Sequence, residues 1–94
     1  MITHKLKGLA STREVWIDNE WLDPRPSQKF RNHSPDGFNW GYGGSGPSQL
    51  ALAIALKLGK QDNYMNFKWN VISLLPINEN FDIIFTDRDF EKVS

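Results

Sequence analysis

The clearest hydrophobic pattern along the chain lies between Pro47 and Gly59. Pro47 opens SQLALAIALKLG, in which positions 50 to 58 are apolar on almost every side of a helix. Proline is favoured at the first helical position, and glycine is a natural left-handed stop. Ser45 is a candidate N-cap, although it stands one or two residues early. The pattern predicts a helix that is buried on more than one side, with alanines that allow neighbouring backbone to approach closely.

A short hairpin is predicted before this helix. Residues 13–18 (REVWID) are rich in β-branched and aromatic residues, and 18–20 (DNE) are typical of a turn. Trp21 and Leu22 then supply the apolar positions of a second strand.

Pro24 and Pro26 exclude a central strand before about residue 27. We interpret 27–33 (SQKFRNH) as extended, so that alternate side chains point to opposite faces and Phe30 lies alone on one of them. Residues 34–37 (SPDG) form a strong turn signal, after which the chain resumes an extended path. The basic residues of the extended segment share its other face: Lys29, Arg31 and His33.

The second half of the chain predicts a helix, a strand and a final short helical turn. Residues 64–75 have the spacing of an amphipathic helix, and a strand over 69–74 is the alternative. Residues 81–85 (FDIIF) read as a strand, and Thr86 with Asp89 resembles a capping pattern for a last turn through Val93. The stripe of the amphipathic helix is Tyr64, Phe67, Lys68, Val71, Ile72 and Leu75.

Together these elements predict an α+β fold in one domain, 1–94. A small single-layer antiparallel sheet carries the long buried helix on one face, with the second amphipathic helix beside it. The 94 residues suit one small domain, and 39% hydrophobic and 13% aromatic residues suit a folded chain rather than a disordered one. Without cysteine, disulfides and thiolate metal sites are excluded, which fits a reducing cytoplasm.

Net charge argues against a polybasic nucleic-acid binder, because 11 basic residues balance 11 acidic ones. The distribution is uneven: residues 1–60 hold eight basic against five acidic residues, and residues 61–94 hold three against six. No apolar run approaches a membrane span, and the first ten residues lack the apolar core of a signal peptide. We expect a cytoplasmic protein with no membrane contact.

One constellation suggests binding chemistry: a basic segment that leads into the glycine-rich loop 41–46 (GYGGSG) at the start of the long helix. First-turn N–H groups of a helix have no intrahelical partner and attract anions, above all phosphate. The GxGxxG spacing here is a weak dinucleotide fingerprint, since no βαβ unit follows, and Pro47-Ser48 replaces the lysine of a P-loop. A phosphate-bearing ligand is nevertheless the functional prediction for this loop.

The predicted hydrogen-bond donors to the ligand are the loop N–H groups, the Ser45 and Ser48 hydroxyls and the side chains of the basic segment. The Trp40 and Tyr42 rings are the predicted stacking surface for a base. A purely structural account of the loop is the alternative, because glycines between a strand and a helix can serve only to turn the chain and let the helix pack on the sheet. Trp40, with Trp16 and Trp69, also suits the core. The candidate residues are Lys29, Arg31, His33, Trp40, Tyr42, Gly43, Gly44, Ser45, Gly46 and Ser48.

Catalytic chemistry finds little support in the sequence. His4 stands at an end expected to be loose, His33 is alone, and no His or carboxylate spacing suggests a metal site. Ser45 only half meets the spacing of a nucleophile elbow. The sequence therefore favours a binding protein over an enzyme, with no catalytic residue, metal or cofactor assigned.

The segment 32–51 (NHSPDGFNWGYGGSGPSQLA) resembles a family of short bacterial, prophage and phage proteins catalogued as a domain of unknown function. Its hallmark is a phrase of the type NHSPxGFxWGYGGSGPxQLALAIL. The earlier VWIDNEWLDPRPS and the later FKWNVISLLP are similar to its pattern, so the resemblance spans about 15–76.

The resemblance implies a compact domain in a mobile-element setting and no particular activity. Small phage proteins of this kind often counter host defence, either by sequestering a nucleotide signal or short nucleic acid, or by binding a host defence protein directly in the manner of an anti-CRISPR. The first option fits the glycine loop. The second fits a neutral chain rich in aromatics. A homodimer is expected to be possible under either, because a helix apolar on nearly all sides needs extensive cover.

Overall fold

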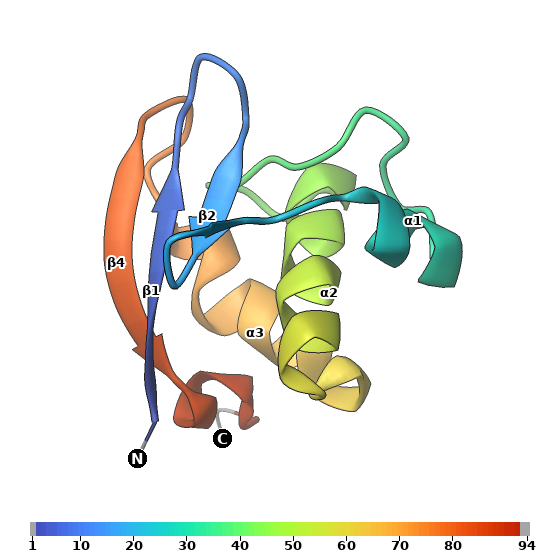
Figure 1. Ribbon diagram of the computed structural model, residues 1–94, viewed down its shortest axis with the longest axis vertical. Coiled ribbons are helices and arrows are strands. Elements are labelled where there is room, and N and C mark those ends of the chain that lie inside the picture. The colour runs from blue at the N-terminus through green and yellow to red at the C-terminus, as the bar shows by residue number, and fades with distance from the viewer. Residues whose placement is uncertain (1, 93–94) are drawn as a thin grey trace.

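The computed structural model of the protein describes residues 2–92 and has an antiparallel sheet with helices on one of its faces (Figure 1). The fold is α+β, as predicted. The sheet has four strands in the order β3-β2-β1-β4. Its strands are β1 (Thr3–Gly8), β2 (Val15–Ile17), β3 (Glu20–Trp21) and β4 (Phe81–Thr86). The α-helices are α1 (Arg25–Phe30), α2 (Ser45–Leu58) and α3 (Tyr64–Asn70), and the 3-10 helices are η1 (Gln61–Asn63), η2 (Ile72–Leu74) and η3 (Asp87–Phe90).

The predicted hairpin is confirmed as β2 and β3, with Trp16 opposite Trp21. The two residues between the strands, Asp18 and Asn19, have φ values of 51° and 68°. Positive φ at both central positions is the requirement of a type I′ turn, which Asp and Asn tolerate better than most residues.

Strand β1 was not predicted, and the expectation of a loose end around His4 is wrong. β1 lies between β2 and β4 and pairs with both. His4 Nδ1 lies 2.7 Å from Asp18 Oδ2, and its ring stacks on Phe85. The segment THKLKG alternates strictly but has only one large apolar side chain, Leu6, so its pattern is weak. At Gly8 a Cβ atom would lie 2.3 Å from the Phe81 ring, so glycine lets β4 pack closely.

Helix α1 corrects the extended interpretation of 27–33. Pro24 is the N-cap and Pro26 lies in the first turn, where proline is favoured because its nitrogen needs no acceptor. Ser27 Oγ donates a 2.7 Å hydrogen bond to the Pro24 carbonyl. The prolines that exclude a strand thus begin a helix here, and Lys29, Arg31 and His33 do not form one face of a strand.

Helix α2 begins at Ser45, two residues before the predicted start, with Gly44 as N-cap and no side-chain cap. It ends as predicted, at Gly59 with φ 71°. Residues 46 to 55 are all buried, which confirms a helix covered on several sides.

Helix α3 covers only the first half of the predicted 64–75 helix. The backbone breaks at Val71 (φ −129°, ψ −61°) and continues as η2, and the alternative strand over 69–74 is not formed. Strand β4 and the capping box of Thr86 and Asp89 on η3 are confirmed. Val93, the predicted end of that turn, lies outside the described residues.

The core lies between the sheet and α2 and α3. Phe67 of α3 packs edge-on against Phe85 of β4 and stacks on Phe90 at 4.4 Å between ring centroids. Trp40 is fully buried against Phe81. No helix within residues 2–92 is long and apolar enough to cross a membrane.

Candidate functional site

The glycine loop leads into the first turn of α2 and is closely packed against other parts of the chain. A Cβ atom at Gly43 would lie 2.7 Å from the Trp69 ring, and one at Gly44 would lie 2.3 Å from the Tyr42 ring. At Gly46 it would lie 2.5 Å from Asn39 Cβ. At Gly46 the missing side chain is therefore a packing requirement, which supports the structural account there, whereas the exposed Trp69 and Tyr42 rings could move aside at Gly43 and Gly44.

The first turn of α2 still has free hydrogen-bond donors. Within the described residues, no acceptor is found for the N–H groups of Ser45 and Gly46, and Pro47 has none to offer. Ser48 is already engaged, because its N–H and its hydroxyl both donate to the Gly44 carbonyl. Ser45 is exposed and Ser48 is buried, so only the Ser45 hydroxyl is open to a ligand.

Lys68 of α3 is the side chain that the sequence analysis missed. It is only 5% exposed, and its Nζ donates a 3.2 Å hydrogen bond to the Gly43 carbonyl. The same Nζ lies 4.5 Å from the centre of the Trp69 ring. No ion pair to Lys68 occurs between residues 2 and 92. Burial lowers the pKa of its ammonium group, because a charge withdrawn from water is destabilised. The loop thus adjoins a buried cation that has no counter-ion in the described part of the chain.

His33 lies on the same side of the molecule, beside α3. Its Nε2 is 2.9 Å from the hydroxyl of Tyr64, which is one helical turn before Lys68. Burial, then the charges of Arg31 and Lys68, lower the pKa of the His33 imidazole. The two charges that lower the His33 pKa, those of Arg31 and Lys68, are both positive.

Gln49 of α2 holds the 27–34 segment in place. Its Oε1 accepts hydrogen bonds from the His33 and Ser34 N–H groups at 2.7 and 2.9 Å. Its Nε2 donates to Ser27 Oγ and to the Arg31 carbonyl. Gln49 is fully buried, so these bonds fix where His33 stands.

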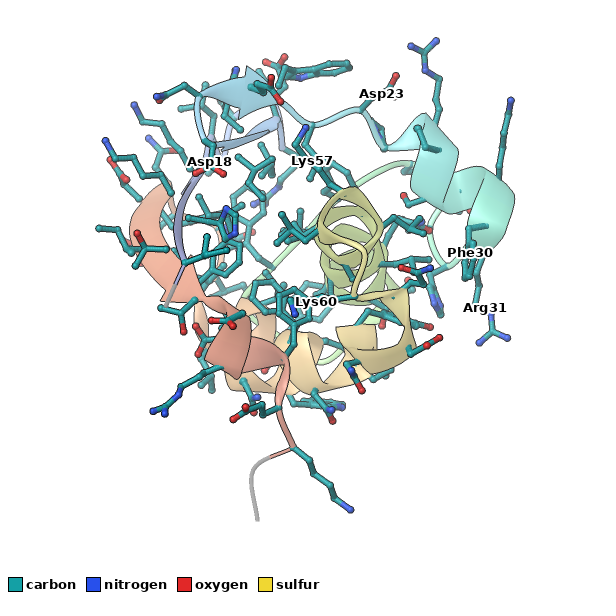
Figure 2. All side chains as sticks on the ribbon, turned by 60° about the horizontal axis from the view of Figure 1, so that its bottom comes forward. Asp18, Asp23, Phe30, Arg31, Lys57 and Lys60 are labelled. Atoms are coloured by element: carbon teal, nitrogen blue, oxygen red, sulfur yellow. The ribbon has the colours of Figure 1, made fainter. Side chains whose placement is uncertain are left out.

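The predicted residues separate into those near the loop and those away from it. Lys29 is exposed in the last turn of α1, and Arg31 follows that helix and extends into solvent beside Phe30, away from the body of the protein (Figure 2). Trp40 is buried and its Nε1 donates to the Glu79 carbonyl, so it offers no stacking surface. Tyr42 remains partly exposed beside the loop, and Trp69, which the sequence also allowed as core, is 54% exposed.

A weak signal for Lys68 was present in the sequence. Lys68 is a charged residue within an otherwise apolar helical stripe, where an amphipathic helix normally has none. Its nearness to the loop was not readable, because Lys68 and Gly43 are 25 residues apart.

The described residues hold no metal-binding cluster, since no three His, Asp or Glu side chains gather in the range 2–92. No curated protein and no solved structure matches the chain. A family model matches residues 5–94, which is nearly the whole chain. The protein therefore belongs to the family of unknown function DUF6166.

Proposed function

We propose that this protein is a non-enzymatic, cytoplasmic binding protein for a phosphate-bearing ligand, a nucleotide signal or a short nucleic acid, held at the N-terminal end of α2. The observation that carries the proposal is Lys68, a lysine only 5% exposed, bonded to the loop and without a carboxylate partner among residues 2–92. A buried cation normally requires a counter-charge, and a bound phosphate would supply one.

The free N–H group of the exposed Ser45 adds to this cation. It stands at the positive end of a 14-residue helix, where phosphate is favoured by both hydrogen bonds and the helix dipole. Trp69 and Tyr42 are the partly exposed rings beside the loop, and either can stack on a base. If the mobile-element setting holds, sequestering such a ligand is a counter-defence activity.

The test is calorimetric titration of the folded protein with pyrophosphate, mononucleotides and cyclic dinucleotides. We expect binding by at least one probe, weakened about tenfold or more in Lys68→Met, since a charge-assisted hydrogen bond contributes about 1.5–3 kcal/mol. Lys60→Met is the matched control, because Lys60 Nζ lies over the Phe90 ring instead of the loop. Equal binding by both variants, or no binding of any probe, contradicts the proposal.

A second candidate function, a module that inhibits a host defence complex through protein contacts, is favoured by a different observation. Large apolar side chains stand exposed from the loop through η2 and beyond: Tyr42, Trp69, Leu74 and Ile77 at 39, 54, 75 and 53%. Gly41 packs against the Ile77 backbone and Gly43 against Trp69, which places these residues in one region. Exposed apolar patches mark protein contacts.

The two functions differ in their response to Leu74→Ser. This variant leaves the phosphate site intact and removes the most exposed large apolar side chain of residues 2–92. A protein inhibitor should lose its partner in a pull-down, whereas a phosphate binder should bind its ligand as before. Asp87 is a suitable acidic position for charge reversal in the same assay, but Asp89 is not, because Asp89 Oδ2 accepts the Thr86 N–H in the capping box.

A further inference from the structure

The sheet has one face without helices, and its side chains form an ordered surface. In Figure 1 the helices all lie on one side of β1, β2 and β4. Strand register places Trp21, Trp16, Lys7 and Asp82 in one row across the four strands, because each is the direct partner of the next. Lys5 and Ile84 are partners in the next row of the same face. We call this surface, defined by these six residues, the open face.

The open face is hollowed and its aromatic residues are accessible. A shallow depression of about 460 Å³ is lined by Lys5, Lys7, Trp16 and Ile84 among others. Trp21 is 49% exposed and Ile84 67%. Trp16 is half-buried, whereas an indole as exposed as that of Trp21 indicates a surface that contacts another molecule.

The charge of the open face indicates which kind of molecule it binds. The three ion pairs of the described residues are His4 with Asp18, Arg25 with Asp23 and Lys57 with Glu20, so neither lysine of the open face is paired. Asp82 is the one acidic residue among the six, which leaves the surface net basic. Lysine is depleted from the cores of protein interfaces, whereas lysines beside aromatic rings are typical of surfaces that bind single-stranded nucleic acid.

The spacing of the lysine and tryptophan side chains also fits a single-stranded nucleic acid. Neighbouring strands lie about 4.8 Å apart, so Lys7 stands one strand away from Trp16 and two from Trp21. A base stacked on either indole therefore has a phosphate of its own strand within reach of a flexible lysine side chain. Duplex bases are already stacked on each other and cannot use such rings.

We propose that the open face binds a short single-stranded nucleic acid, with bases stacked on Trp16 and Trp21 and phosphates against Lys5 and Lys7. This site is separate from the loop site on the helical side, and neither requires the other.

The test is fluorescence anisotropy with a fluorescein-labelled ten-nucleotide oligothymidylate at several salt concentrations. We expect the double variant Lys5→Gln/Lys7→Gln to bind at least about tenfold more weakly, with a salt slope reduced by about 1.4, or about 0.7 for each phosphate that a lysine no longer neutralises. Trp21→Ala should also weaken binding about tenfold, because a base can no longer stack on its indole. Melting temperatures of all variants are measured first, and only folded proteins are compared.

A control separates this site from general charge. Lys60→Gln/Lys92→Gln removes the same charge elsewhere and should bind within about twofold of the parent. Equal losses in the Lys60/Lys92 control, tighter binding of the matching duplex, or no binding by the parent overturns the proposal. Capture of a purified protein partner that Trp21→Ala abolishes, without oligonucleotide binding, also overturns it and assigns the face to a protein.

Discussion

Gly46 shows how residue-scale packing decides what the loop can tolerate. Its φ is not in the left-handed region, so glycine is needed there for space and not for conformation. Gly59 is the opposite case: its φ is 71°, and no heavy atom lies within 4 Å of the position that a Cβ would take. The two glycines at either end of α2 therefore have different physical causes.

Substitutions at these two glycines should separate the causes. Gly46→Ala should lower the free energy of unfolding by about 1–3 kcal/mol through overpacking against Asn39, and Gly46→Asn by more. Gly59→Ala should cost about 1 kcal/mol, and Gly59→Asn less, because Asn tolerates the left-handed conformation. Urea unfolding measures all four. If Asn is better tolerated than Ala at both positions, conformation and not space controls Gly46.

Lys68 should be costly for stability and needed only for binding. Replacing a buried charge by an apolar side chain of similar length is often neutral or stabilising, so Lys68→Met should keep or raise the melting temperature. Thermal unfolding by circular dichroism checks this. A fall of more than about 5 °C, or roughly 1 kcal/mol, would mean that the bond to the Gly43 carbonyl is a structural need, and would remove the main support of the proposed function.

The lowered pKa of His33 makes stability depend on pH. The unfolded state, with an ordinary pKa of 6.5, takes up the proton first as the pH falls. Stability from neutral His33 is thus fully present above pH 6.5 and is lost as the pH falls below that value. Urea unfolding at pH 7.5, 6.5 and 5.5 should show a smaller decline in His33→Gln than in the parent. The same decline in both proteins would mean that His33 titrates normally.

At the scale of elements, α1 depends on α2 more than on its own residues. A six-residue helix is too short to be stable alone. Prolines begin it, and the buried side chain of Gln49 then makes one hydrogen bond to Ser27 within α1 and three to the segment that follows. The placement of His33 at the candidate site is therefore a property of the contact between α1 and α2.

Loss of the Gln49 side-chain amide should release the 27–34 segment. Gln49→Leu leaves the half-buried Ser34 N–H without its acceptor, and the His33 N–H with only the Arg31 carbonyl at 3.2 Å, so it should lower the free energy of unfolding by about 1–3 kcal/mol. Gln28→Leu is the control: Gln28 Nε2 donates to the Ser34 and Pro35 carbonyls nearer the surface, and its loss should cost less than about 1 kcal/mol. Hydrogen exchange of the His33 and Ser34 amides should rise only in the Gln49 variant. Equal costs would show that Gln49 is not the anchor.

At the scale of the whole molecule, helix α2 is covered by other elements of the same chain. Residues of α1, α3, β1, β2 and the 38–40 segment enclose it, and its buried stretch runs from Gly46 to Ala55. The sequence argument for a homodimer rested on apolar surface that would need a partner helix. That surface is already covered within the chain, so a homodimer stays a prediction without this support.

Two surfaces on opposite sides of the sheet should act independently. Lys68 lies on the helical side, and Lys5 and Lys7 lie on the open face. Effects of distant sites on free energy usually add. Combining Lys68→Met with Lys5→Gln/Lys7→Gln should therefore change stability by the sum of the separate effects within about 0.5 kcal/mol, as measured by urea unfolding. A larger deviation would show that the two surfaces are coupled through the core.

What the sequence determined by itself is local. The Asp18-Asn19 turn, the Gly59 stop and the Thr86 capping box were predictable, because each depends on atoms a few residues apart. The α+β class followed from the same kind of pattern. The extended interpretation of 27–33 failed because Pro24 and Pro26 suit a helix start as well as they exclude a strand.

Tertiary structure decided the rest. β1 has a single large apolar residue and becomes a central strand only because β2 and β4 offer hydrogen bonds on both sides. Lys68 reaches Gly43 across 25 residues, and Trp16 and Trp21 share a row with Lys7 only through strand register. A local pattern records which face of an element is apolar, whereas the partner of that face depends on how all the elements pack, and both candidate binding surfaces of this protein arise from that packing.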